Sequence, residues 1–358
     1  MLFGEAECFP EGNIHGKGNL DRLIGFDAQT DTPGTGILRE CYVSDGRNMK
    51  SFDRHFFLTL VMHKKRKSLW KIQDNLLNLF CSIRKTDKTF TVNIKELYDL
   101  KGKVALVTGG ARHLGFDAAC ALAEAGCDMI ITSRKLENAV QSAEKLHNLH
   151  GGDVLPLSLD VCVYDQVAQV FKAAGQWKGH LDIVVNNAGG NVGTSPANLF
   201  ERDPDDMAQM IMTNLTGALY CCREAGGIMA KQGYGKIINI ASIAGMVGRD
   251  RRMYMRSNLK GQPVDYAAAK AGVIGMTRDL AGFLSPMGVY VNAISPGGFG
   301  PRELPPGFHK DYCDRTPLGR MGTDGKDLKG AILFLASVAS DYITGHNLVI
   351  DGGFTIWK

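Results

Sequence analysis

From Lys101 onward, short apolar runs alternate with segments of helical character, and this alternation restricts the possible folds most strongly. The runs are rich in β-branched residues and apolar along their length, which is typical of strands covered on both faces. The expected strands are 103–108, 127–132, 154–158, 181–186, 236–240, 289–294 and 347–350. The expected helices are 116–125, 136–149, 164–174, 204–231 and 266–284. With right-handed crossovers, this order predicts an α/β fold, a doubly wound parallel sheet in a three-layer sandwich.

Residues 1–97 show no such pattern, because Gly, Asp, Asn and basic residues are scattered among them. A short helix is expected over 68–83. The basic run Lys64–Lys67 is either a nucleic-acid or targeting patch or a solvated stretch, and the second reading is favoured. We therefore expect a single domain over 98–358 with an irregular N-terminal extension, 1–97, which is poorly ordered or binds a partner.

The composition argues against several classes of function. A net charge of +4 is too small to indicate nucleic-acid binding, and no apolar segment is long enough to cross a membrane. The apolar stretch His55–Met62 precedes its basic residues, the reverse of a secretory signal. The nine cysteines form no CxxC pair and no zinc-ligand spacing, so no metal site is expected. Free cysteines in apolar stretches favour a reducing compartment, the cytoplasm.

A glycine-containing turn, 108–115, lies between the first expected strand and the first helix. Glycines at this place let the backbone turn tightly and approach a pyrophosphate at the positive end of the helix. The turn resembles the TGxxxGxG motif of the short-chain dehydrogenase/reductase family, in its compact branch, at Thr108, Gly109 and Gly115. The middle glycine is replaced by His113, whose ring could contact phosphate instead, while Arg112 stands where the extended branch would require glycine.

This resemblance implies a Rossmann-type fold that binds NAD or NADP through a defined set of residues. Asp160 matches the adenine contact, Asn186–Gly189 the NNAG motif, and Pro296-Gly297 the turn beside the nicotinamide. The implied cofactor contacts are Gly109, Arg112, His113, Leu114, Gly115, Ser133, Arg134, Asp160, Val161, Asn187, Ala188, Gly189, Tyr266, Lys270, Pro296 and Gly297.

The end of the second strand indicates which dinucleotide is bound. An acidic residue there would bind the ribose 2′-hydroxyl of NAD, but this chain has Ser133-Arg134, and Arg112 adds a second guanidinium. Planar guanidinium groups bind phosphate well, so NADP is favoured, with NAD as the alternative. The alternative interpretation is that both arginine side chains are exposed to solvent and have no role in binding.

The resemblance also implies a catalytic set of Asn214, Ser242, Tyr266 and Lys270. Tyr266 and Lys270 lie one helical turn apart, and an ammonium beside a phenol favours the phenolate, so Tyr266 is the expected acid–base group. Ser242 would hold the substrate oxygen, and Asn214 would support a proton relay to Lys270. The family's threonine after the Pro-Gly turn would fall at Pro301 and is absent.

Between Ser242 and Tyr266 the chain is longer than in most of the family, and the segment 246–264 is cationic. Its charges are Arg249, Arg251, Arg252, Arg256 and Lys260. Such a rim would favour an anionic substrate, although a solvated or subunit-interface loop is equally compatible.

Three functions remain open at this point. The first is an NADP-preferring oxidoreductase that acts on a small sugar acid or polyol, similar to gluconate 5-dehydrogenase-type enzymes and assembled as a homotetramer. The second is a 3-oxoacyl thioester reductase, which would need a wide apolar groove. The third is a non-catalytic NADP-binding sensor, which usually loses the tyrosine or the lysine that this chain retains.

Overall fold

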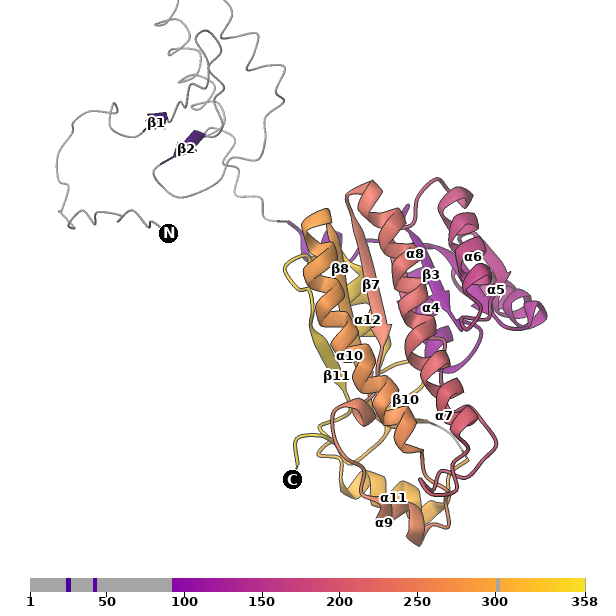
Figure 1. The fold of residues 1–358 in the computed structure, drawn as a ribbon. Coiled ribbons are helices and arrows are strands. Elements are labelled where there is room, and N and C mark those ends of the chain that lie inside the picture. Colours follow the sequence, from indigo (N-terminus) through magenta and orange to yellow (C-terminus); the bar gives the residue numbers. More distant parts are fainter. Residues whose placement is uncertain (1–23, 27–40, 44–91, 301–302, 358) are drawn as a thin grey trace, which may run out of the picture. The chain divides into compact units, whose positions relative to one another are not determined.

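The computed structural model describes residues 24–26, 41–43, 92–300 and 303–357 (Figure 1). The chain divides into two units, residues 1–90 and residues 91–358. In the first unit, β1 (Ile24–Phe26) pairs with β2 (Cys41–Val43) in antiparallel fashion. The helix expected over 68–83 and the basic run at 64–67 lie outside the described residues.

A parallel sheet forms the centre of the second unit, with the strand order β11-β8-β7-β6-β3-β4-β5. Its strands are β3 (Val104–Thr108), β4 (Asp128–Ser133), β5 (Val154–Ser158), β6 (Ile183–Asn186), β7 (Gly235–Ile240), β8 (Val289–Pro296) and β11 (Asn347–Ile350). The chain runs outward from β3 to β5, then returns to build the other half from β6 to β11. The carboxyl ends of β3 and β6 therefore diverge into a crevice, the usual ligand site of such sheets.

Helices cover both faces of the sheet (Figure 1). They are α4 (His113–Glu124), α5 (Leu136–His150), α6 (Tyr164–Trp177), α8 (Gly217–Gln232), α10 (Val264–Leu284) and α12 (Lys329–Ala336). Along β3, Ala105 and Val107 pack in one core with α4, α5 and α12. Val104 and Leu106 pack in the other core with α6, α8 and α10. Because successive side chains point to opposite faces, central strands such as β3 are buried on both, and the predicted doubly wound fold is confirmed.

The helix expected over 204–231 is interrupted in the structure. It consists of α7 (Pro204–Ile211), a π-helical turn over Met212–Thr216, and α8. Within this turn, the buried side-chain amide of Asn214 donates to the carbonyl of Met210 at 3.2 Å, in competition with the backbone. Single π-turns of this kind are frequent at functional sites. The expectation of one continuous helix was wrong because periodicity does not reveal an inserted wide turn.

The cationic segment also contains structure that its composition did not indicate. It carries the short helix α9 (Arg251–Arg256), which packs against α11 (Pro306–Asp314) at one end of the unit (Figure 1). Nearby, β9 (Phe299–Gly300) and β10 (Gly322–Thr323) form a second, short parallel pair. Across the described ranges, no helix has the length and apolarity that a bilayer crossing demands.

Candidate active site

A cleft of about 1840 Å³ opens at the carboxyl ends of the strands. All sixteen residues predicted to contact the cofactor line it, and so does Ser242. The fourth predicted catalytic residue, Asn214, is buried behind Gly189, which does line the cleft. The structure thus brings together in one place residues that lie far apart in the sequence.

Hydrogen bonds hold the Gly-rich turn against the segment that follows β6. Asn187 donates its side-chain amide to the carbonyls of Thr108 and Gly109, both at 3.0 Å. Thr108 Oγ1 accepts from the backbone N–H groups of Asn187 and Ala188, also at 3.0 Å. A Cβ at Gly115 would lie 2.3 Å from the carbonyl oxygen of Gly109. Only glycine fits there, which leaves the turn close against the first turn of α4, as a pyrophosphate site requires.

His113 occupies the place of the family's middle glycine without changing the backbone path. Its φ angle is +50°, in the left-handed region that glycine adopts freely, and it begins α4. For a residue with a Cβ, this conformation costs about 1–2 kcal/mol. The exposed side chain of His113 lines the cleft.

Two arginine side chains lie beside this turn. Arg134 follows β4 and Arg112 precedes α4; both are exposed and both line the cleft. Among the described residues, neither side chain forms a salt bridge or hydrogen bond, and no carboxylate ends β4. This donor set, with Ser133 beside it, fits a phosphorylated ribose, so the residues present are compatible with a bound dinucleotide.

Lys270 and Asn214 flank Gly189 on the other side of the cleft. The Lys270 ammonium donates to the carbonyl of Ile240 at 2.8 Å and lies 5.8 Å from the centre of the Tyr266 ring. Burial lowers the pKa of Lys270 from 10.5 to about 8. A Cβ at Gly189 would lie 2.6 Å from Asn214 Oδ1 and 3.7 Å from Lys270 Nζ. The glycine therefore permits the close approach of the amide and the ammonium.

The amide of Asn214 is held by the segment after β6, and Ser242 by the segment after β7. Asn214 exchanges two 2.8 Å hydrogen bonds with the backbone of Gly190, which fixes the orientation of its amide. Ser242 Oγ accepts from the backbone N–H of Ala244 at 3.1 Å. Since that bond uses only an acceptor site, the hydroxyl proton of Ser242 stays available for a substrate oxygen.

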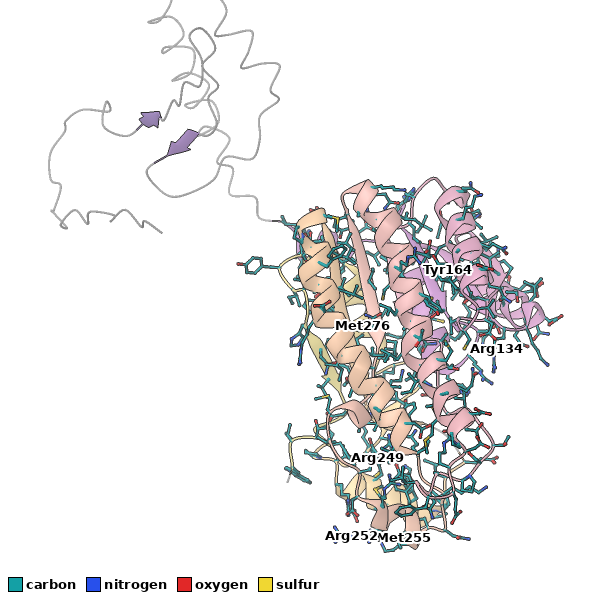
Figure 2. All side chains as sticks on the ribbon, in the orientation of Figure 1. Arg134, Tyr164, Arg249, Arg252, Met255 and Met276 are labelled. Carbon is teal, nitrogen blue, oxygen red and sulfur yellow. The ribbon has the colours of Figure 1, made fainter. Side chains whose placement is uncertain are left out.

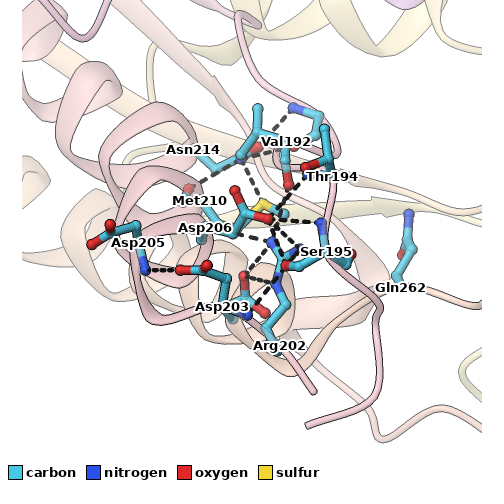
Figure 3. A network of polar contacts seen from close by, with 12 residues as sticks. Val192, Thr194, Ser195, Arg202, Asp203, Asp205, Asp206, Met210, Asn214 and Gln262 are labelled. Carbon is cyan, nitrogen blue, oxygen red and sulfur yellow. Dashed lines mark hydrogen bonds and ion pairs between the residues drawn. The ribbon is translucent and has the colours of Figure 1, made fainter. Parts of the chain in front are cut away.

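A buried ionic network, which sequence reasoning missed, connects the segment after β6 with the start of α10 (Figure 3). The Arg202 side chain, 3% exposed, pairs with Asp265 at 2.9 Å and donates to the carbonyl of Val192 at 3.0 Å. Asp206 accepts from the backbone and the hydroxyl of Ser195, at 2.9 and 2.5 Å. Asp265 directly precedes Tyr266, so this network positions the expected acid–base group relative to the residues around Asn214.

Aromatic and other apolar side chains line the end of the cleft opposite the Gly-rich turn. They come from the inserted segment, from α11 and from the C-terminal segment. Met253, Phe308 and Tyr312 form a buried cluster there, and Tyr312 stacks on Phe354 with ring centres 4.5 Å apart. The Tyr312 hydroxyl accepts from the backbone N–H of Gly298, beside the Pro-Gly turn. No local motif could have identified these residues, because α9 and α11 meet only in the fold. Pro301 lies outside the described residues.

A parallel sheet whose Gly-rich turn and Tyr-Lys pair face one cleft defines the class of dinucleotide-dependent oxidoreductases. Residues 109–355 match the family model described as enoyl-(acyl carrier protein) reductase. The chain belongs to the short-chain dehydrogenase/reductase family, and it is an NAD(P)-dependent oxidoreductase that acts on alcohols and ketones.

Three relatives illustrate the range of this similarity. The chain is 34% identical to the NADP-dependent mannitol dehydrogenase of Hypocrea jecorina, over 73% of this chain and 95% of that protein. It is 36% identical to a 3-oxoacyl-(acyl-carrier-protein) reductase of Thermotoga maritima, over 72% and 99%. Among solved structures, a gluconate 5-dehydrogenase from Burkholderia cenocepacia in complex with NADP and tartrate is similar with a TM-score of 0.67, at 32% identity over 74% of this chain and 100% of that one.

Proposed function

We propose that this chain is an NADP(H)-preferring dehydrogenase that interconverts a secondary alcohol and a ketone on a small sugar acid or polyol. One observation carries the cofactor preference: Arg134 and Arg112 line the cleft at the end of β4, and neither pairs with a described carboxylate. A 2′-phosphate would supply the missing counter-charge, whereas the 2′-hydroxyl of NAD would not.

The predicted catalytic residues divide the proton chemistry among them. The bound nicotinamide supplies or accepts the hydride. Tyr266 donates a proton to the developing alkoxide in reduction and accepts one in oxidation. Lys270 stabilises the phenolate with its ammonium, and Ser242 donates a hydrogen bond to the substrate oxygen. Asn214, fixed by Gly190 and next to Lys270 across Gly189, supports a relay of water molecules that would carry the proton to and from the ammonium.

Polar side chains at the mouth of the substrate end support a small, hydroxylated substrate. Asn191, Lys260 and Gln262 line this part of the cleft. The named substrates of relatives, mannitol and 2-dehydro-3-deoxy-D-gluconate, have the same character. A cytoplasmic location and a homotetramer remain predictions.

A 3-oxoacyl thioester reductase is the second candidate. The Thermotoga maritima relative has this activity in its name, and it is as similar to this chain as the mannitol dehydrogenase is. The aromatic cluster around Phe308 and Tyr312 would provide an apolar wall for an acyl chain.

A cofactor-consumption screen tests both candidates. The full-length chain is assayed with NADPH and NADH on keto sugar acids, ketoses and 3-oxoacyl thioesters, and with the oxidised cofactors on the corresponding alcohols. We expect the highest kcat/KM with NADP(H) on a sugar acid or a polyol. A higher kcat/KM on the thioesters would replace the first candidate by the second, and a preference for NADH would contradict the cofactor proposal.

A further inference from the structure

Most of the cations in the segment 246–264 do not face the cleft. Arg252 pairs with Asp250 at 2.8 Å, and Arg256 with Asp311 at 2.6 Å. In Figure 2, Arg252 lies with Met255 at the outer end of this region, whereas Arg249 lies closer to the sheet. Two of the five cations of the segment are therefore paired with neighbouring carboxylates, and Arg249 needs separate consideration.

The Arg249 guanidinium lies beside the expected acid–base group. Its central carbon is 5.5 Å from the centre of the Tyr266 ring, and both residues line the cleft. Nη1 donates to the carbonyl of Gln262 at 3.2 Å, while Nη2 is buried and forms no hydrogen bond. No salt bridge within the described part of the chain includes Arg249.

Burial lowers the pKa of Arg249, and the charged groups that influence it are Tyr254, Tyr266 and Arg251, with no carboxylate among them. An arginine nevertheless stays protonated at neutral pH. A buried cation with an unsatisfied donor costs free energy unless an anion accompanies it. Arg202 differs in this respect, because its guanidinium, which is more deeply buried than that of Arg249, has Asp265 as its partner.

We propose that Arg249 binds a carboxylate of the substrate and thereby makes the enzyme select sugar acids over neutral polyols. This inference rests on the proposed function and narrows its substrate class. A carboxylate in the cleft accepts a hydrogen bond from the guanidinium and supplies the counter-charge, while the hydroxyl of a polyol can do only the first. Because Arg249 lies beside Tyr266, it would hold the carboxylate close to the reacting carbon. This arrangement fits a substrate in which a short carbon chain carries both groups.

The inference is tested with D-gluconate and D-glucitol, which share a carbon skeleton and differ in one carboxylate. Arg249→Gln should lower kcat/KM for D-gluconate by ~10- to 100-fold, as expected for the loss of a charge-assisted hydrogen bond, and change kcat/KM for D-glucitol by less than twofold. Arg249→Lys keeps the charge but not the planar fork and should give an intermediate loss. Arg251→Gln, an exposed cation of the same segment, is the matched control and should change neither value.

An equal loss on both substrates, together with a shifted pH–rate profile, would assign Arg249 to the tuning of Tyr266 and overturn the inference. If the wild-type protein oxidises neither compound, the proposed function fails, but Arg249 remains testable by binding. Calorimetric titration of tartrate into the NADP-loaded protein should then show binding to the wild type that is at least tenfold weaker in Arg249→Gln. Equal affinity in the two proteins, or no binding to the wild type, would refute the carboxylate site.

Discussion

The two halves of the cleft are built in different ways. The cofactor half consists of strand ends and the turns that follow them, such as the turn after β3 and the Asn187–Gly189 segment after β6. The substrate half consists of α9, α11 and the segments beside them, which come from separate parts of the chain. Most of the expected contacts in the cofactor half follow a strand closely in sequence, apart from Tyr266 and Lys270 on α10. The substrate half depends on packing between distant segments.

Because the two halves are built differently, they tolerate different amino-acid substitutions. The turn after β3 is restricted by glycine at position 115, where a Cβ would meet a carbonyl oxygen at 2.3 Å. The substrate half is held by side chains such as Phe308 and Tyr312, which other residues of similar volume could replace. We therefore expect cofactor binding and substrate selection to respond separately to substitution, and four predictions test this separation.

Tyr266→Phe should have the largest effect, because it removes the expected proton donor while leaving the ring in place. Turnover should fall by about 100- to 10,000-fold. The affinity for NADPH, measured by fluorescence titration, should change by less than about threefold, since the cofactor half is intact. The exposed Tyr342→Phe serves as the control. A variant that retains turnover would remove Tyr266 from its assigned role.

Arg202→Ala should be the most destabilising substitution, because it breaks the buried network that connects the segment after β6 with the start of α10. Asp265, whose side chain is 8% exposed, would lose its partner, and the free energy of unfolding should drop by about 3–5 kcal/mol. Lys310→Ala, which removes an exposed pair with Asp314, should cost less than ~0.5 kcal/mol. Urea denaturation of the two variants compares these values. Similar losses would show that the network does not hold these two segments together.

Lys270→Met tests the burial of the ammonium through pH. Because the pKa of Lys270 falls from 10.5 in the unfolded chain to about 8 in the fold, the charged form destabilises the protein below pH 8. This cost disappears as the pH rises from 8 to 10.5, where the folded protein has released the proton. The variant should thus be at least as stable as the wild type at pH 7, and its relative advantage should shrink by pH 10. An advantage that grows with pH, measured by urea denaturation, would contradict this sign.

Arg134→Asp should give the smallest change and should affect the cofactor half alone. Loss of a charge-assisted contact to the 2′-phosphate predicts a shift of about 10- to 100-fold in the NADPH/NADH ratio of kcat/KM. The substrate KM with the preferred cofactor should stay within about twofold. Lys172→Asp, a charge reversal of an exposed residue on α6, provides the control. An unchanged cofactor ratio would refute the 2′-phosphate contact.

Particular residues show how far sequence reasoning extends. The seven strands of the main sheet were predictable because strands of a parallel sheet covered on both faces are largely apolar. The interruption at Asn214 was not, since a single π-turn is too short to be recognised in a helical pattern that continues on both sides of it. The Arg202–Asp265 pair spans 63 positions, and nothing in either local sequence connects the two residues.

The sequence alone determined the parallel sheet, the Gly-rich turn and the residues placed at its strand ends, because periodicity and glycine positions are local properties that act through the backbone. Only the tertiary structure decided which cations of the 246–264 segment, Arg249 and Lys260, line the cleft. Arg252 and Arg256 found carboxylates nearby, and Arg249 did not. Charge pairing depends on distances between side chains in the folded molecule, and composition does not contain those distances.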